Sequence, residues 1–177
     1  MSKFFWRPLF STRAIAVWRR NFLVWKKLAI PSVLGNLADP MIYMLGLGYG
    51  LGALLPNIEG VSYITFLAAG TICYSTMNSA TFETLYSSFS RMHVQKTWDA
   101  ILNAPVILDD VILGEWIWGA SKSMLSGIAI LIIIWLFDIA QFGWMSLWIV
   151  PIIALIGLCF AGMGLVMTAL SSSYDFF

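Results

Sequence analysis

The residues of this chain best suited to catalysis are three acids and a histidine near its middle. Asp109, Asp110 and Glu115 lie close together, and His93 is the only histidine in the sequence. Paired acids can hold magnesium and a pyrophosphate, as a metal-dependent membrane transferase would require. The backbone dipole also favours acids at a helix N-terminus, where Asp109 would be a suitable N-cap. We favour capping and keep a transferase that uses Asp109 and Asp110 as the alternative.

Other signatures of enzymes are missing from the sequence. His93 has no partner at metal-ligand spacing, and no His-Glu-x-x-His, Gly-x-Ser-x-Gly, Cys-x-x-Cys or Walker lysine motif occurs. We therefore expect no catalytic residue, metal site or cofactor in this chain, and no ATP hydrolysis by the chain alone. No nucleic-acid partner is expected either.

The composition is that of an integral membrane protein. Of the 177 residues, 60% are hydrophobic and only 11% are charged, whereas soluble domains are about a quarter charged. Backbone polar groups must be satisfied internally in lipid, so we predict an all-α fold. The sequence has four apolar stretches, which predict four transmembrane helices at about 28–55, 61–82, 116–137 and 147–170.

The distribution of charge predicts the topology. Seven of the ten Lys and Arg residues precede the first stretch, and the short connections at 56–60 and 138–143 contain none. The positive-inside rule therefore places residues 1–27 and the central segment, about 91–110, in the cytoplasm. Residues 13–27 form an amphipathic, basic helix that we expect to lie at the membrane surface, in contact with lipid. The apolar residues at helical spacing are Ile15, Trp18, Phe22, Trp25 and, just beyond the helix, Ala29; the basic ones are Arg13, Arg20 and Lys27.

Small residues within the stretches predict close helix packing. Gly119, Ser123 and Gly127 recur every four residues, and the glycines of 46–52 form two further pairs, Gly46 with Gly50 and Gly48 with Gly52. Lys122 lies in the third stretch beside Gly119 and Ser123, and we expect its side chain to reach the membrane surface or Glu115.

Polar residues within the stretches have two interpretations. Asp39 precedes Pro40 in the first stretch, and the latter half of the second is rich in Ser, Thr and Asn. The favoured interpretation is hydrogen bonding between helices; the alternative is a translocation path. The residues of such a path would be Asp39, Ser75, Asn78 and Ser79.

The central segment is the one long polar interruption of the chain. Residues 97–104 predict a short helix ended by Pro105, with an exposed Trp98 that would fit a groove on a partner. Such a contact would transmit motion to the two spans that the segment joins.

The order of these features resembles the type-2 ABC exporter permeases, and in particular their NodJ-like branch, which exports lipo-oligosaccharides. The resemblance rests on the basic helix, the glycine-rich first stretch and the motifs Tyr63-Ile-Thr-Phe-Leu-Ala-Ala-Gly70, Lys96-Thr-Trp-Asp-Ala-Ile-Leu-Asn-Ala-Pro105 and Asp109-Asp-Val-Ile-Leu-Gly-Glu-Trp116. It implies a bacterial inner-membrane permease that pairs with a second copy and binds a separate ATPase subunit, which holds ATP and magnesium. The cargo would be an amphipathic glycan or, alternatively, a drug.

The resemblance also implies where the ATPase binds. The family's coupling element corresponds to Met92 through Ala104. Members have six spans, so we expect residues 28–170 to be the first four, and 171–177 to begin a missing C-terminal part. A structural or assembly subunit without its own transport path is the remaining alternative. The expected coupling contacts are Met92, Val94, Gln95, Lys96, Thr97, Trp98, Asp99, Ala100, Ile101 and Leu102.

Overall fold

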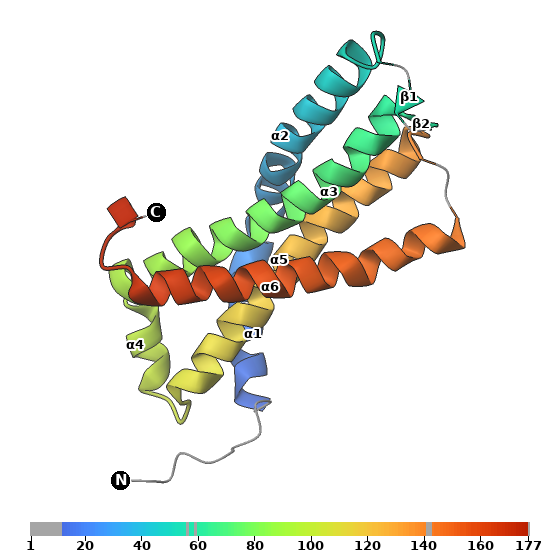
Figure 1. Ribbon diagram of the computed structural model, residues 1–177. Helices are drawn as coiled ribbons and strands as arrows, with labels where there is room; N and C mark the ends of the chain where they lie inside the picture. Colours follow the sequence, from blue (N-terminus) through green and yellow to red (C-terminus); the bar gives the residue numbers. More distant parts are fainter. Residues whose placement is uncertain (1–11, 56, 59, 141–142, 177) are drawn as a thin grey trace.

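The structure is a bundle of helices, given by a computed structural model that describes residues 12–55, 57–58, 60–140 and 143–176 (Figure 1). The expected all-α fold is confirmed, with one small hairpin between the first two long helices. Lys3 and Arg7 of the basic N-terminal region lie outside the described residues. The long helices are α2 (Ala29–Gly50), α3 (Tyr63–Phe82), α5 (Leu108–Leu136) and α6 (Ile149–Leu170).

The first helix is amphipathic, as the sequence predicts. Helix α1 (Thr12–Lys26) packs on the N-terminal half of α5, and a bend of 82° at Lys27 and Leu28 separates it from α2. The indole of Trp18 donates a hydrogen bond to Ser121 Oγ in α5 at 3.1 Å. Helix α1 is therefore held against the bundle along one side.

The hairpin joins α2 to α3. Strands β1 (Asn57–Ile58) and β2 (Val61–Ser62) pair antiparallel, with Asn57 opposite Ser62, and Gly60 turns the chain at a φ of +85°. Ser62 then caps α3 by accepting the backbone N–H of Thr65. The hairpin thus reverses the chain at one end of the bundle.

The polypeptide stays helical well beyond the expected end of the second span. After Phe82 it continues as two π-helical segments, η1 (Glu83–Ser88) and η2 (Ser90–Val94). Lys96 then adopts a left-handed φ of 54°, which stops the helix and starts the short helix α4 (Thr97–Leu102).

The third long helix begins at Leu108, earlier than the expected start at Trp116. The first turn is polar, so the hydropathy of the sequence does not reveal it. Asp110 stabilises this turn because its Oδ2 accepts the N–H of Ile107 at 3.3 Å. Asp109 was expected to be the cap; this is wrong, since Ile107 occupies that position and the Asp109 side chain is exposed.

Length and hydropathy alone support fewer membrane spans than the four expected. Among the described residues, two helices are long and apolar enough to cross a membrane: α5, and the segment Trp144–Leu170, which consists of η3 (Trp144–Trp148) and α6. Helices α1 and α2 would make a third span if the bent pair is counted as one. Helix α3 is not among them, because its many Ser and Thr residues lower its hydropathy. It nevertheless packs beside α2 and α5, with α6 lying across α3 and α5 (Figure 1).

Small residues allow the long helices to approach closely. A Cβ on Gly119 would meet Thr84 and Ala161, and one on Gly127 would meet Thr76 and Ile153. The predicted stripe on α5 therefore does pack against α3, η1 and α6.

The glycines of α2 are divided in their contacts. A Cβ on Gly48 would meet Ile64 of α3, whereas one on Gly52, which follows the end of α2, would meet the carbonyl of Gly48 first and Tyr63 only at 3.8 Å. A Cβ on Gly46 or Gly50 would meet no heavy atom within 4 Å among the described residues. Of these four glycines, Gly48 alone is therefore packed tightly against another helix in the described part of the chain.

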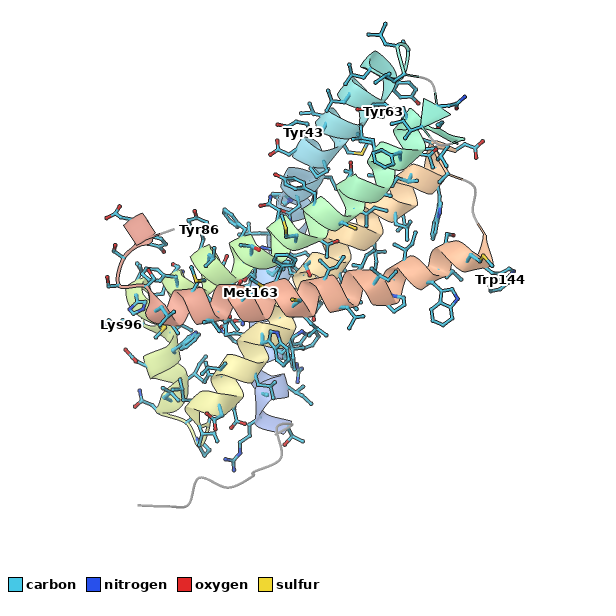
Figure 2. All side chains as sticks on the ribbon, in the orientation of Figure 1. Tyr43, Tyr63, Tyr86, Lys96, Trp144 and Met163 are labelled. Carbon is cyan, nitrogen blue, oxygen red and sulfur yellow. The ribbon has the colours of Figure 1, made fainter. Side chains whose placement is uncertain are left out.

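The two ends of the bundle differ in character. Figure 2 shows Lys96 beside α4 at one end and Trp144 at the other. Trp144 is 84% exposed. The main apolar core lies towards the Trp144 end and includes Met44, Ile72, Ile130 and Ile153.

Candidate functional site

Four charged side chains meet inside the protein where the central segment joins the long helices. We call Glu83, Arg91, Glu115 and Lys122 the charged cluster. Arg91 Nη2 lies 2.9 Å from Glu83 Oε1 and also bonds Glu115 Oε2, while Lys122 Nζ lies 2.6 Å from Glu83 Oε2. The side chain of Glu115 has no exposed surface and that of Glu83 is 4% exposed. Arg91 therefore connects the C-terminal end of α3 to the N-terminal half of α5 through buried ion pairs.

Neutral side chains complete the hydrogen bonding of both acids. Asn21 Nδ2 in α1 donates to Glu115 Oε1 at 3.0 Å, and Ser88 Oγ donates to Glu115 Oε2 at 2.9 Å. The indole of Trp118 donates to Glu83 Oε1 at 2.8 Å. Buried carboxylates are tolerated when paired and fully hydrogen-bonded, and the loss of one partner is costly.

The helices put these residues on facing sides. Glu115, Trp118 and Lys122 are spaced by three and four positions, which is one face of an α-helix. Glu83 and Ser88 are five apart, and both point to this face because η1 has π-helical i to i+5 bonding. The unusual helix is thus what brings the end of the second predicted span to α5.

The charge of Arg91 is secured by its neighbours. Burial alone would lower the pKa of Arg91, but the carboxylates of Glu115 and Glu83 outweigh burial and raise the pKa above its ordinary value. The guanidinium is therefore charged throughout the physiological range, and the cluster acts as a fixed connection.

The sequence predicted the wrong partner for Lys122. We expected it to approach Glu115 or the membrane surface, whereas its amine binds Glu83 and Arg91 occupies Glu115. Asn21 and Trp118 were also missed as members of the site. Charges in apolar segments must pair, and this rule draws attention to Glu83 and Lys122, but sequence spacing does not tell which partners meet.

The predicted coupling residues divide into an exposed and a covered group. Val94 is 61% exposed and Leu102 38%, and Asp99 and Ala100 of α4 are also exposed. Among the remaining predicted contacts, Gln95 and Lys96 are exposed, whereas Met92, Thr97 and Ile101 are half-buried.

Trp98 was expected to be exposed, and this is wrong. Its side chain is 6% exposed and packs against Val17 of α1 and Val111 of α5. The expectation considered the short helix alone, whereas α1 and α5 cover its apolar side. We call Trp98, Val17 and Val111 the Trp98 cluster.

The four residues predicted for a translocation path lie together. Asp39, Ser75, Asn78 and Ser79 all line one cavity of about 200 Å³ between α2, α3 and α5. Ser75 and Ser126 are hydrogen-bonded across α3 and α5 at 3.1 Å, as the packing interpretation expects. The hydroxyl of Ser79 is buried and makes no hydrogen bond to the described residues. The four residues thus share one cavity, and their role as a translocation path stays a prediction.

The acids that suggested catalysis have structural partners. Asp110 holds the start of α5 and Glu115 belongs to the charged cluster. The ring of His93 packs on Phe89, with centroids 4.5 Å apart. Within the described part of the chain, no three His, Cys, Asp or Glu residues are placed to hold a metal ion.

Comparison with known proteins identifies the family of this chain. Residues 12–177 match the model of the ABC-2 type transporter family. The chain is 49% identical over 164 residues to nodulation protein J of Rhizobium meliloti strain 1021, covering 92% of this chain and 62% of that protein. It is 34% identical over 162 residues to nodulation protein J of Azorhizobium caulinodans, covering 92% and 63%.

These relatives are longer than the chain, which spans about 62% of their length. No solved structure matches. The family match covers nearly the whole sequence and describes transport proteins rather than transferases. The chain therefore belongs to the ABC-2 type transporter family.

Proposed function

We propose that this chain is the permease subunit of an ATP-driven exporter for a lipo-oligosaccharide or a related amphipathic glycan. The cargo is suggested by the resemblance of this sequence to the NodJ-like exporters, and the similarity to nodulation protein J supports that resemblance. A separate ATPase subunit binds ATP and magnesium, and two permease copies form the pore. The observation that carries the mechanism is the bonding of Arg91, in the central segment, to Glu83 directly after α3 and to Glu115 in the N-terminal half of α5.

The ATPase contact is the exposed side of the segment 92–102. Val94, Asp99 and Leu102 are exposed there, so a partner can reach them without rearrangement of the chain. The opposite side of α4 carries Trp98, which is fixed against α1 and α5. A displacement of α4 by the ATPase is therefore passed directly to two other helices.

The charged cluster supplies a second route for the same displacement. Arg91 lies five residues before Lys96, where the helix ends, and it is bound to Glu83 and Glu115. Bonds between charged groups are directional and strong when buried. Movement of η2 therefore moves the adjoining ends of α3 and α5 together.

The arrangement also supports a bacterial inner-membrane protein in which α1 and α4 lie on the cytoplasmic side. The Trp98 cluster joins α1 to α4, so the two basic regions lie at the same end of the bundle. At the other end Trp144 and Trp148 are 84% and 74% exposed, which suits the opposite membrane interface. The open side of α2 at Gly46 and Gly50 is available to a second permease copy.

Coupling is tested by Trp98→Ala in vesicles that contain the permease and its ATPase. We expect ATPase binding to persist and export per ATP hydrolysed to fall about fivefold or more, since allosteric coupling is typically 1–3 kcal/mol. Asp99→Ala with Leu102→Ala should instead weaken ATPase binding, because both side chains are exposed. Export of labelled lipo-oligosaccharide, ATP hydrolysis and co-purification of the ATPase are measured together.

The matched control is Trp144→Ala, which removes an exposed tryptophan at the other end and should leave coupling unchanged. Equal export per ATP in Trp98→Ala and the wild type would contradict the proposed contact. Export unaffected in every variant would favour a structural or assembly subunit. Stimulation of the ATPase by drugs, and not by the glycan, would favour the multidrug alternative.

A further inference from the structure

A second polar cavity opens onto the charged cluster: Glu83, Arg91 and Lys122 line it together with Arg20, which has no part in the proposed coupling route. It measures about 480 Å³ and is enclosed by α1, the bend before α2, the π-helical segments and α5. Ligand sites in proteins are commonly 300–1,000 Å³. The cavity is therefore large enough for the headgroup of a lipid.

The acids around this cavity have their acceptor atoms occupied. Glu83 Oε1 accepts from Arg91 and Trp118, and Glu83 Oε2 accepts from Lys122. Both oxygens of Glu115, just behind the lining, accept from Arg91 and from neutral donors. A cationic ligand would find no free carboxylate here.

Donors, in contrast, are in excess. Arg20 lines the cavity, and its Nη1 donates to Asn21 Oδ1 at 2.8 Å. Among the described residues no carboxylate lies within ion-pair distance of Arg20. Burial lowers the pKa of Arg20 and the positive charge of Arg91 lowers it further, against the opposing effect of Glu115. Arg20 thus makes no ion pair among the described residues and is influenced unfavourably by a second cation, Arg91.

The charge balance indicates a monoanion. Arg20, Arg91 and Lys122 are three cations, whereas Glu83 and Glu115 are two acids, so one positive charge is left uncompensated. A phosphodiester supplies one negative charge and several acceptor oxygens, which match these donors.

The outer edge of the cavity is apolar. Val24 and Leu28 line it and are 52% and 64% exposed. They flank the 82° bend, where a helix that lies along the membrane surface would turn into a span. A ligand with an anionic head and apolar chains fits both parts of the site.

We propose that this cavity binds the phosphodiester of an anionic phospholipid, with Arg20 contacting the phosphate and Val24 and Leu28 contacting the acyl chains. The assignment does not depend on export or on the identity of the cargo. Zwitterionic lipids should bind less well, because their ammonium group has no free carboxylate to meet.

The test is native mass spectrometry of the purified full chain in detergent, with an equimolar mixture of phosphatidylglycerol and phosphatidylcholine that have identical acyl chains. We expect the wild type to retain phosphatidylglycerol about fivefold over phosphatidylcholine, since one basic residue near a membrane surface contributes about that factor. Arg20→Gln should lose the preference. Arg19→Gln is the matched control, because Arg19 is exposed and does not line the cavity.

Three results would overturn the proposal. The first is equal retention of both lipids by the wild type, which needs no variant and therefore no assumption about folding. The second is an equal loss in Arg20→Gln and Arg19→Gln, which would indicate a general surface effect. The third is displacement of the bound lipid by inorganic phosphate at the same concentration, which would assign the site to free phosphate. Displacement by added phosphatidylglycerol alone would support the phospholipid proposal.

Discussion

The two halves of α5 are held in place by different kinds of interaction. The half that begins at Leu108 carries Glu115, Trp118 and Lys122, which are fixed by ion pairs and hydrogen bonds to α1 and the π-helical segments. The other half packs through Gly127, Ile130 and similar residues against α2, α3 and α6. Directional bonds fix the register of a helix, whereas apolar contacts between smooth surfaces permit sliding. The difference predicts a rigid α4 end and a more adaptable hairpin end.

The strongest challenge to this contrast is Arg91→Ala. It leaves two buried carboxylates without their shared cation, which should lower the free energy of unfolding by about 3–5 kcal/mol. Unfolding of the purified chain in detergent measures the effect, with Lys96→Ala as an exposed control. Adding Glu115→Gln to Arg91→Ala should restore part of the loss, because Lys122 can still neutralise Glu83. Equal stability of Arg91→Ala and the control would contradict a rigid α4 end.

A smaller effect is expected from Gly127→Val in the other half of α5. The new side chain would meet Thr76 and Ile153, and overpacking of this kind typically costs about 1–3 kcal/mol. Gly46→Val is the matched control, since a Cβ there meets nothing within 4 Å. The same unfolding assay compares them, and an equal loss in both would show that helix propensity, rather than packing, decides the outcome.

The smallest effect concerns Ser126→Ala, which removes the hydrogen bond to Ser75. Hydrogen bonds between membrane helices contribute about 0.6 kcal/mol on average, so stability should change little. Thermal unfolding should place this variant close to the wild type. A loss as large as that of Arg91→Ala would mean that polar contacts between α3 and α5 are as decisive as the charged cluster.

Much of the fold follows from local patterns in the sequence. Apolar length and turn residues locate the long helices, and the basic periodicity of residues 13–27 predicts α1 to within one residue at each end. The stripe of Gly119, Ser123 and Gly127 is likewise a local signal that the structure bears out. These features depend on the period of a single helix, which the sequence contains.

The candidate site depends on how separate helices meet, which is harder to predict from the sequence. The burial of Trp98 requires α1 to cover α4, and the pairing of Lys122 with Glu83 requires the π-helical turn at Glu83–Ser88. Neither the crossing of two helices nor a π turn has a clear signature in a single sequence. Glu115, Lys122 and Trp98 were therefore recognisable as unusual in the sequence, whereas their partners were not, and Asn21 and Trp118 were missed.

The bend between α1 and α2 has a geometric consequence for motion. Two arms that meet at 82° are nearly perpendicular, so a rotation of α1 about its own axis swings α2 sideways if the joint keeps its angle. Helix α2 has 22 residues and is about 33 Å long, so a turn of about 5° would carry its far end about 3 Å. A small twist of α1 would thus appear at the far end of α2 as a displacement about the size of a water molecule.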